Sequence, residues 1–103
     1  MTGGERGSAP ADVLAPQGDA AQAAVIREVI AERARQDELW GIQDHDPYLW
    51  LAILTEEVGE VARALLDATE EHRDVVGYRE ELIQVAAVAV AMVEAWDRRL
   101  PSQ

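Results

Sequence analysis

Apolar residues recur every three or four positions along three stretches of the chain, which is the spacing of amphipathic helices. The first stretch covers residues 19–39. Asp19 and Gln22 resemble a capping box at its start, and Gly41 is well placed to end it. We therefore expect a first helix of about six turns.

Two further helices follow from the same spacing. Residues 47–68 follow Asp46 and Pro47, a pair that is typical of an N-cap and a first helical turn. Residues 75–99 end just before Pro101. These patterns predict an all-α fold, an antiparallel bundle of three main helices with room for one short extra helix.

The N-terminal stretch differs from the rest of the chain. Residues 1–18 contain most of the glycines and show no hydrophobic periodicity. Such composition is typical of a flexible tail. We expect a single helical domain over residues 19–100.

The third predicted helix is apolar nearly all round, because Gln84 is the one polar residue between positions 82 and 93. Two partner helices from the same chain cannot cover such a helix. The pattern therefore predicts a homodimer or homotetramer with this helix at its centre. We expect Trp50, Met92 and Trp96 in the core.

Two of these helices carry carboxylates on their apolar faces. Glu57 lies in the middle of the stripe of its helix, and Glu60 projects from the rim of that stripe. Glu81 and Gln84 occupy the equivalent positions on the third helix. An ionised carboxylate in an apolar interior is unfavourable unless it is paired, hydrogen-bonded or bound to a metal.

Two interpretations of these carboxylates are open. In one, they converge between antiparallel helices and bind a hard cation, Mg²⁺ or Mn²⁺, since the ligand set is all oxygen and the chain has no cysteine. In the other, Glu57 and Glu81 extend to solvent or pair with Arg63 and Arg79 on their own helices. Two such residues at matching helical spacing favour the first.

The composition of the chain limits the classes of binding partner that we expect. The net charge is -11 and every basic residue is arginine. With no basic patch, we expect neither nucleic acid nor an anionic membrane as a partner. A polyphosphate ligand would need metal ions to offset the negative field.

The longest apolar run, residues 85–93, is too short to span a bilayer. The lack of cysteine fits a cytoplasmic protein, and residues 1–18 contain no signal-peptide core.

The apolar stripe of the first helix turns polar toward its end, where it continues as Arg33, Gln36, Asp37 and Trp40. These residues could form the wall of a nucleotide pocket, with Trp40 stacking on a flat ring. Alternatively, the helix end emerges into solvent and Trp40 is a hydrophobic lid. The spacing does not separate the two.

At this point the motifs resemble a known family. Residues 56–61, Glu-Glu-Val-Gly-Glu-Val, and residues 80–86, Glu-Glu-Leu-Ile-Gln-Val-Ala, resemble those of the MazG-like all-α nucleotide pyrophosphohydrolases. Residues 35–41, Arg-Gln-Asp-Glu-Leu-Trp-Gly, look like the helix-end segment of small phage and actinobacterial members. The resemblance covers about residues 26–96.

The resemblance implies Mg²⁺-dependent hydrolysis of a nucleoside triphosphate to the monophosphate and pyrophosphate, with the clearing of unwanted nucleotides as one role for it. Glu57, Glu60 and Glu81 would be the catalytic metal ligands, and Gln84 the fourth metal position. The family has aspartate where this chain has Gln84. A glutamine oxygen can bind a cation, but it brings no charge.

Three alternatives remain. The chain could be a weakened homologue that binds nucleotide or serves as an oligomeric interaction module. A ferritin-like di-iron protein is disfavoured because His45 and His72 are not at Glu-x-x-His spacing, and both are expected on solvated loops. An acidic DNA mimic gives no reason for glutamates on apolar faces.

Overall fold

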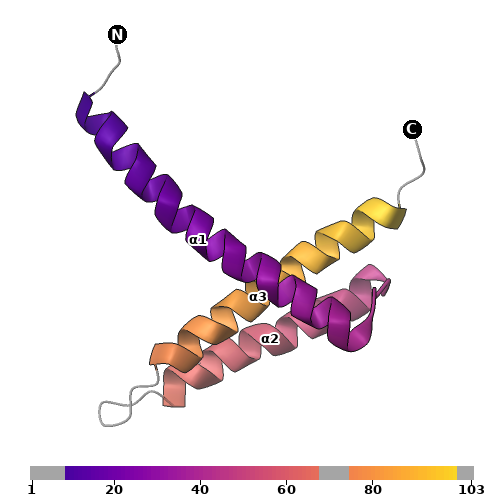
Figure 1. The fold of residues 1–103 in the computed structure, drawn as a ribbon. Coiled ribbons are helices and arrows are strands. Elements are labelled where there is room, and N and C mark those ends of the chain that lie inside the picture. Colours follow the sequence, from indigo (N-terminus) through magenta and orange to yellow (C-terminus); the bar gives the residue numbers. More distant parts are fainter. Residues whose placement is uncertain (1–8, 68–74, 100–103) are drawn as a thin grey trace.

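The computed structural model describes residues 9–67 and 75–99, with side chains over 18–67 and 77–99. They form three helices, α1 (Ala9–Trp40), α2 (Pro47–Asp67) and α3 (Val75–Arg99), with no strand in these ranges (Figure 1). The all-α prediction is confirmed. Within the same ranges, none of the helices has the length and apolar character needed to cross a bilayer.

The connection between α1 and α2 has the predicted caps. Gly41 adopts a φ of 73°, and its N–H donates to the carbonyl of Asp37 at 2.7 Å, which closes the end of α1. The Asp46 carboxylate accepts hydrogen bonds from the N–H groups of Tyr48 and Leu49, both at 2.9 Å. These donors have no partner within the helix, so Asp46 is the N-cap of α2.

The predicted start of α1 is wrong. The helix begins at Ala9, ten residues before Asp19, so part of the predicted tail is helical. Alanine is the strongest helix former, and three of residues 9–15 are alanine, which the periodicity argument did not weigh. Residues 1–8 lie outside the described residues, as does His72. The division into a tail and a domain stays a prediction.

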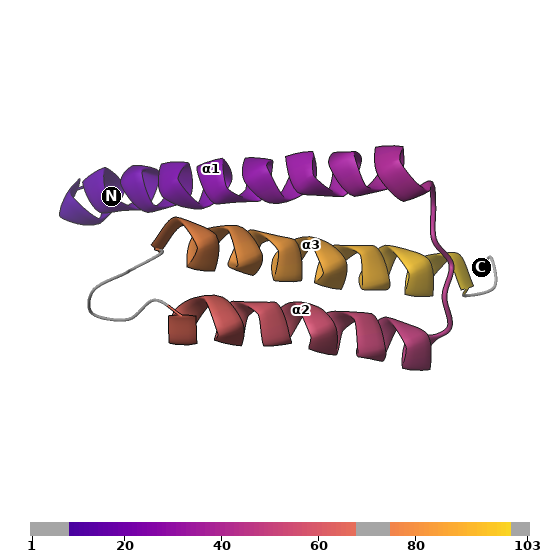
Figure 2. The same ribbon diagram turned by 90° about the horizontal axis from the view of Figure 1, so that it is seen from below.

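Helix α3 lies between the other two helices and packs against both (Figures 1 and 2). Helices α2 and α3 run antiparallel as a hairpin, and α1 crosses α3 at an angle. The radius of gyration is 18.5 Å, whereas a compact domain of this length has about 13 Å. The chain is therefore open rather than closed round one core.

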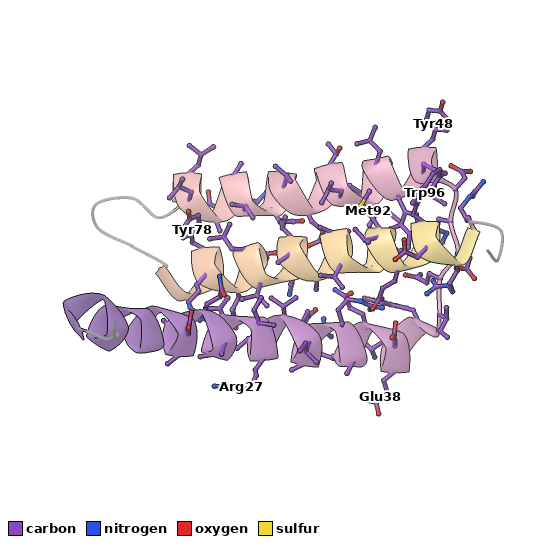
Figure 3. All side chains as sticks on the ribbon, turned by 90° about the horizontal axis from the view of Figure 1, so that it is seen from above. Arg27, Glu38, Tyr48, Tyr78, Met92 and Trp96 are labelled. Atoms are coloured by element: carbon purple, nitrogen blue, oxygen red, sulfur yellow. The ribbon has the colours of Figure 1, made fainter. Side chains whose placement is uncertain are left out.

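The buried cluster is small and lies between α2 and α3, and Val29 of α1 and Ala87 of α3 are also buried. Trp50 is only 5% exposed, and Met92 packs beside the buried residues from the facing helix (Figure 3). The prediction for Trp96 is wrong, because its side chain is 50% exposed. It lies near the end of α3, where it lines a small cavity together with Pro47 and Trp50 of α2. The buried cluster consists of Trp50, Val88, Ala91 and Ala95.

Candidate functional site

A cavity of about 420 Å³ opens between the three helices. Five of the residues predicted for the site line it, and they come from all three helices. Glu57 and Gln84 form one part of the wall. Arg33, Gln36 and Trp40 of α1 form another. The fold therefore brings the carboxylate motifs and the polar end of the first helix to one place, which the sequence could only suggest.

Gln84 joins the two central carboxylates. With its amide nitrogen turned toward them, Gln84 donates hydrogen bonds to Glu57 Oε1 at 3.3 Å and to Glu81 Oε1 at 2.9 Å. One amide can reach both acceptors only if the carboxylates of α2 and α3 face each other. The predicted convergence of Glu57 and Glu81 is therefore present in the fold.

The electrostatics of the pair are unfavourable without a counter-charge. Burial raises the pKa of Glu57, and the charges of Glu81 and Glu60 raise it further. Burial also raises the pKa of Glu81, with a second contribution from the charge of Glu60. Glu60 itself is exposed at the edge of the site. All three side chains therefore act on one another, although only Glu57 lines the cavity.

The alternative in which arginines neutralise the two partly buried glutamates is not what the fold shows. Arg79 pairs with Glu28 of α1 at 2.7 Å, and Arg63 approaches Glu60 at 3.9 Å. Within the described residues, Glu57 and Glu81 have no ion pair. Their shared partner is the neutral amide of Gln84.

The ligand atoms at this site are of the type that a hard divalent cation prefers, but the side chains that carry them are not close enough together. Glu57, Glu60 and Glu81 offer only oxygen ligands, and a cation would relieve the repulsion that raises the pKa values of Glu57 and Glu81. In the arrangement described, however, no three acidic or histidine side chains in residues 9–67 and 75–99 are close enough to bind one ion together. Binding would require these side chains to turn toward a common point.

Arg33 is already paired within the cavity wall. Its guanidinium donates to Glu94 Oε1 at 2.6 Å and to Asp37 Oδ1 at 3.0 Å, and its side chain is only 14% exposed. These bonds fix α1 to α3. An anionic ligand could use Arg33 only in competition with two carboxylates, so Arg33 first of all positions the wall.

Trp40 and Gln36 are better placed to meet a ligand. The Trp40 side chain lines the cavity and is 60% exposed, so much of it is accessible to a ligand. Gln36 donates to Glu32 Oε2 at 3.2 Å. The helix end does emerge into solvent, but it does so beside the cavity.

The sequence interpretation missed Glu32 and Arg98. Glu32 lines the same cavity, and a hydrogen bond from Arg35 lowers its pKa, so it is a charged carboxylate close to Glu57. It follows Val29 by three positions, so the stripe of the first helix contained the signal. Arg98 also lines the cavity, and its guanidinium donates to Asp44 at 2.8 Å. Nothing in the spacing indicates that pair.

His45 is partly buried, contrary to the expectation of a solvated loop. Its ring lies 5.0 Å from that of Trp50 in an edge-on arrangement. Both rings line a second, smaller cavity of about 180 Å³. The Trp50 Nε1 atom is buried without a hydrogen-bond partner in the described part of the chain. The contact gives His45 a packing role.

The chain was also compared with known proteins. No protein-family model matches it. Searches of curated proteins and of solved structures likewise found no match. The geometry of the cavity is therefore the observation on which a functional proposal has to rest.

Proposed function

We propose that this protein hydrolyses nucleoside triphosphates, dNTPs or NTPs, to the monophosphate and pyrophosphate in the presence of Mg²⁺. One observation carries the proposal: Glu57, which lies within reach of the same Gln84 amide as Glu81, lines a cavity whose wall also includes the exposed side chain of Trp40. Carboxylates suit the metal that accompanies a polyphosphate, and the indole suits a base. The motif resemblance points to the same reaction and to a role in clearing unwanted nucleotides.

The reaction requires little covalent chemistry from the protein. A water oxygen bonds to a phosphorus atom beside the α–β bridging oxygen, the bond to that bridge breaks, and the water gives up a proton. One carboxylate among Glu57, Glu60 and Glu81 would orient the water and take the proton.

The proposed metal ligands are Glu57, Glu60 and Glu81, with the carbonyl oxygen of Gln84 as a neutral fourth. Bound Mg²⁺, or Mn²⁺ in its place, would neutralise charge on the phosphate oxygens. For Gln84 to take part, its amide must turn so that the oxygen replaces the nitrogen that now faces the carboxylates. Trp40 would stack on the base, and Gln36 would contact its polar edge.

The test is release of pyrophosphate from a panel of dNTPs and NTPs with Mg²⁺ or Mn²⁺. Metal-dependent release that falls at least ~100-fold in Glu57→Ala supports the proposal. Glu56→Ala is the matched control, because Glu56 is the exposed neighbour on the same helix and should keep most of the activity. A wild-type protein that releases no pyrophosphate from any nucleotide contradicts the proposal.

The position of Gln84 favours one second candidate, a weakened relative that binds nucleotide without turning it over. In the fold the Gln84 amide already satisfies both carboxylates, which is the place a cation would take. Gln84→Asp separates the two candidates. An enzyme with a suboptimal site gains Mg²⁺ affinity and turnover from the added charge, whereas a module that binds nucleotide without metal gains neither.

A further inference from the structure

A second cavity lies at one end of the hairpin formed by α2 and α3, where α2 begins. Its volume is about 180 Å³. Met92 and Trp96 of α3 lie toward this end of the hairpin, on the side of α2 (Figure 3). Among the described residues, Trp50 alone also lines the cavity that contains Glu57. The residues that line the second cavity, which we call the aromatic cavity, are His45, Pro47, Trp50, Met92, Trp96 and Arg99.

The wall of the aromatic cavity suits a flat ring. The His45 and Trp50 rings meet edge-on with their centroids 5.0 Å apart, and the Trp96 indole supplies a third ring. Met92 adds a thioether, which makes favourable contacts with aromatic rings. A protein cavity of about 150 Å³ is sufficient for one benzene molecule, so the aromatic cavity has room for one ring with a small substituent. Because the Trp96 side chain is 50% exposed, this wall is accessible from solvent.

Two donors in this wall lack an acceptor. The Trp50 Nε1 atom is buried, and within the described residues it has no hydrogen-bond partner. An unmet donor in the interior is unfavourable, so an acceptor beside it would stabilise the fold. Arg99 is exposed and forms no ion pair with any described residue, whereas its neighbour Arg98 is paired with Asp44 at 2.7 Å.

Negative charge is kept out of the same wall. The chain has 20 acidic and 9 basic residues, yet none of the described residues that line the aromatic cavity is acidic. The carboxylate of Asp46, next to His45, is occupied by the N–H groups at the start of α2. Asp97 lies roughly 160° from Arg99 round α3. A cationic ligand would meet Arg99, so the wall favours an anion in spite of its aromatic rings.

We propose that the aromatic cavity binds a small aromatic carboxylate, with its ring against the side chains of Trp50 and Trp96. The carboxylate would pair with the Arg99 guanidinium and supply the acceptor that the Trp50 N–H lacks, since its two oxygens can serve two donors. A nucleotide is too large for this cavity, because drug-sized ligands occupy about 300 Å³ or more. The inference therefore does not rest on the proposed enzymatic activity.

The test is a titration of the ¹⁵N-labelled full chain with benzoate, followed by NMR through the indole N–H signals of its three tryptophans. Trp40→Phe and Trp96→Phe each remove one signal, which assigns all of them. We expect saturable shifts of the Trp50 and Trp96 signals with a Kd on the order of 1 mM, and no shift of the Trp40 signal. Benzamide has the same shape without the charge and should bind at least ~3-fold more weakly.

Two pairs of variants separate the aromatic cavity from general effects. Arg99→Gln should weaken benzoate binding at least ~3-fold, to the level of benzamide. Arg27→Gln is its control, because Arg27 is an exposed arginine that points away from the hairpin (Figure 3). Trp96→Ala should weaken binding about 10-fold through the loss of one ring. Trp40→Ala removes an indole of similar exposure from the other cavity and should leave benzoate binding unchanged.

Three results would overturn the proposal. The first is the absence of any shift of the Trp50 and Trp96 signals at tens of millimolar benzoate. The second is equal binding of benzoate and benzamide by the wild type, because the cavity would then select for a ring alone. The third is a shift of the same two signals with protein concentration in the absence of benzoate, which would assign the cavity to contact with a second copy of the chain.

Discussion

Gln84 stabilises the carboxylates of the site when no metal is bound. Its amide donates to Glu57 and Glu81 at once, so it stabilises two carboxylates that burial and mutual repulsion make unfavourable. A neutral donor offsets only part of a charge repulsion. The residual repulsion is a cost to the fold that removal of one charge should relieve.

We therefore predict that Glu57→Gln raises the melting temperature of the metal-free protein at neutral pH, by roughly 2–5 °C. A raised pKa means that the folded chain binds more protons than the unfolded chain, so wild-type stability falls as the pH rises from the ordinary value of 4.5 through the raised pKa. Below that window both states are protonated and the advantage of the variant disappears. Thermal melts in EDTA from pH 4 to pH 8 measure this.

Glu56→Gln provides the control, since Glu56 is the exposed neighbour of Glu57 on the same helix. It should follow the wild type over the whole pH range. A Glu57→Gln variant that melts at or below the wild-type temperature at pH 7 would show that Glu57 stabilises the fold, and the repulsive pair would have to be abandoned.

At the scale of elements, two glycines show how differently the same residue can act. Gly41 ends α1 at a φ of 73°, where any side chain is strained, although nothing lies within 4 Å of a Cβ built there. Gly59 is inside α2, and its surroundings are open too. The difference is therefore in the backbone alone.

Substitution by alanine should change stability in opposite directions at these positions. Gly41→Ala is expected to cost about 1 kcal/mol because alanine disfavours positive φ, and Gly41→Asn should cost less. Gly59→Ala should stabilise the protein by about 0.5–1 kcal/mol, since alanine is the better helix former. Urea titrations followed by circular dichroism give both values. Equal signs at the two positions would contradict the backbone argument.

Most of the element boundaries could be predicted from sequence because their causes are local. Asp46 caps α2 through its own carboxylate, and Gly41 ends α1 through its own φ, so neighbouring residues were sufficient. Helical spacing likewise placed Glu57 and Glu81 toward each other. The pair of Arg33 with Glu94 joins residues 61 positions apart and depends on the crossing of α1 over α3, which no local pattern encodes.

The same limit explains Trp96. Periodicity shows that a residue lies on an apolar stripe, but it does not show whether another helix of the same chain covers that stripe. Trp96 was predicted to be in the core from its stripe, and its side chain is half exposed because the residues beside it, Pro47 and Trp50 of α2, cover it only in part. The sequence analysis predicted a homodimer or homotetramer from the apolar character of α3 alone. That prediction would account for the exposure of Trp96 and stays a prediction.

For the whole molecule, the excess of negative charge opposes folding. A net charge of -11 disfavours the compact state, and part of this charge is concentrated around Glu57 and Glu81. A cation that binds the folded chain at this point stabilises it by mass action, by about 1.4 kcal/mol at ten times its Kd. We therefore predict that millimolar Mg²⁺ raises the melting temperature by several degrees.

Diffuse screening by salt must be separated from binding at the site. Sodium chloride at matched ionic strength should reproduce only a small part of the shift, because screening acts on all surface charges alike. Glu80→Gln should retain the response, since Glu80 is exposed and points away from its neighbour Glu81. Glu57→Gln should lose it. If Mg²⁺ stabilised Glu57→Gln as much as the wild type, the ion would be acting on the general charge of the chain, and the proposed metal site between α2 and α3 would have no support.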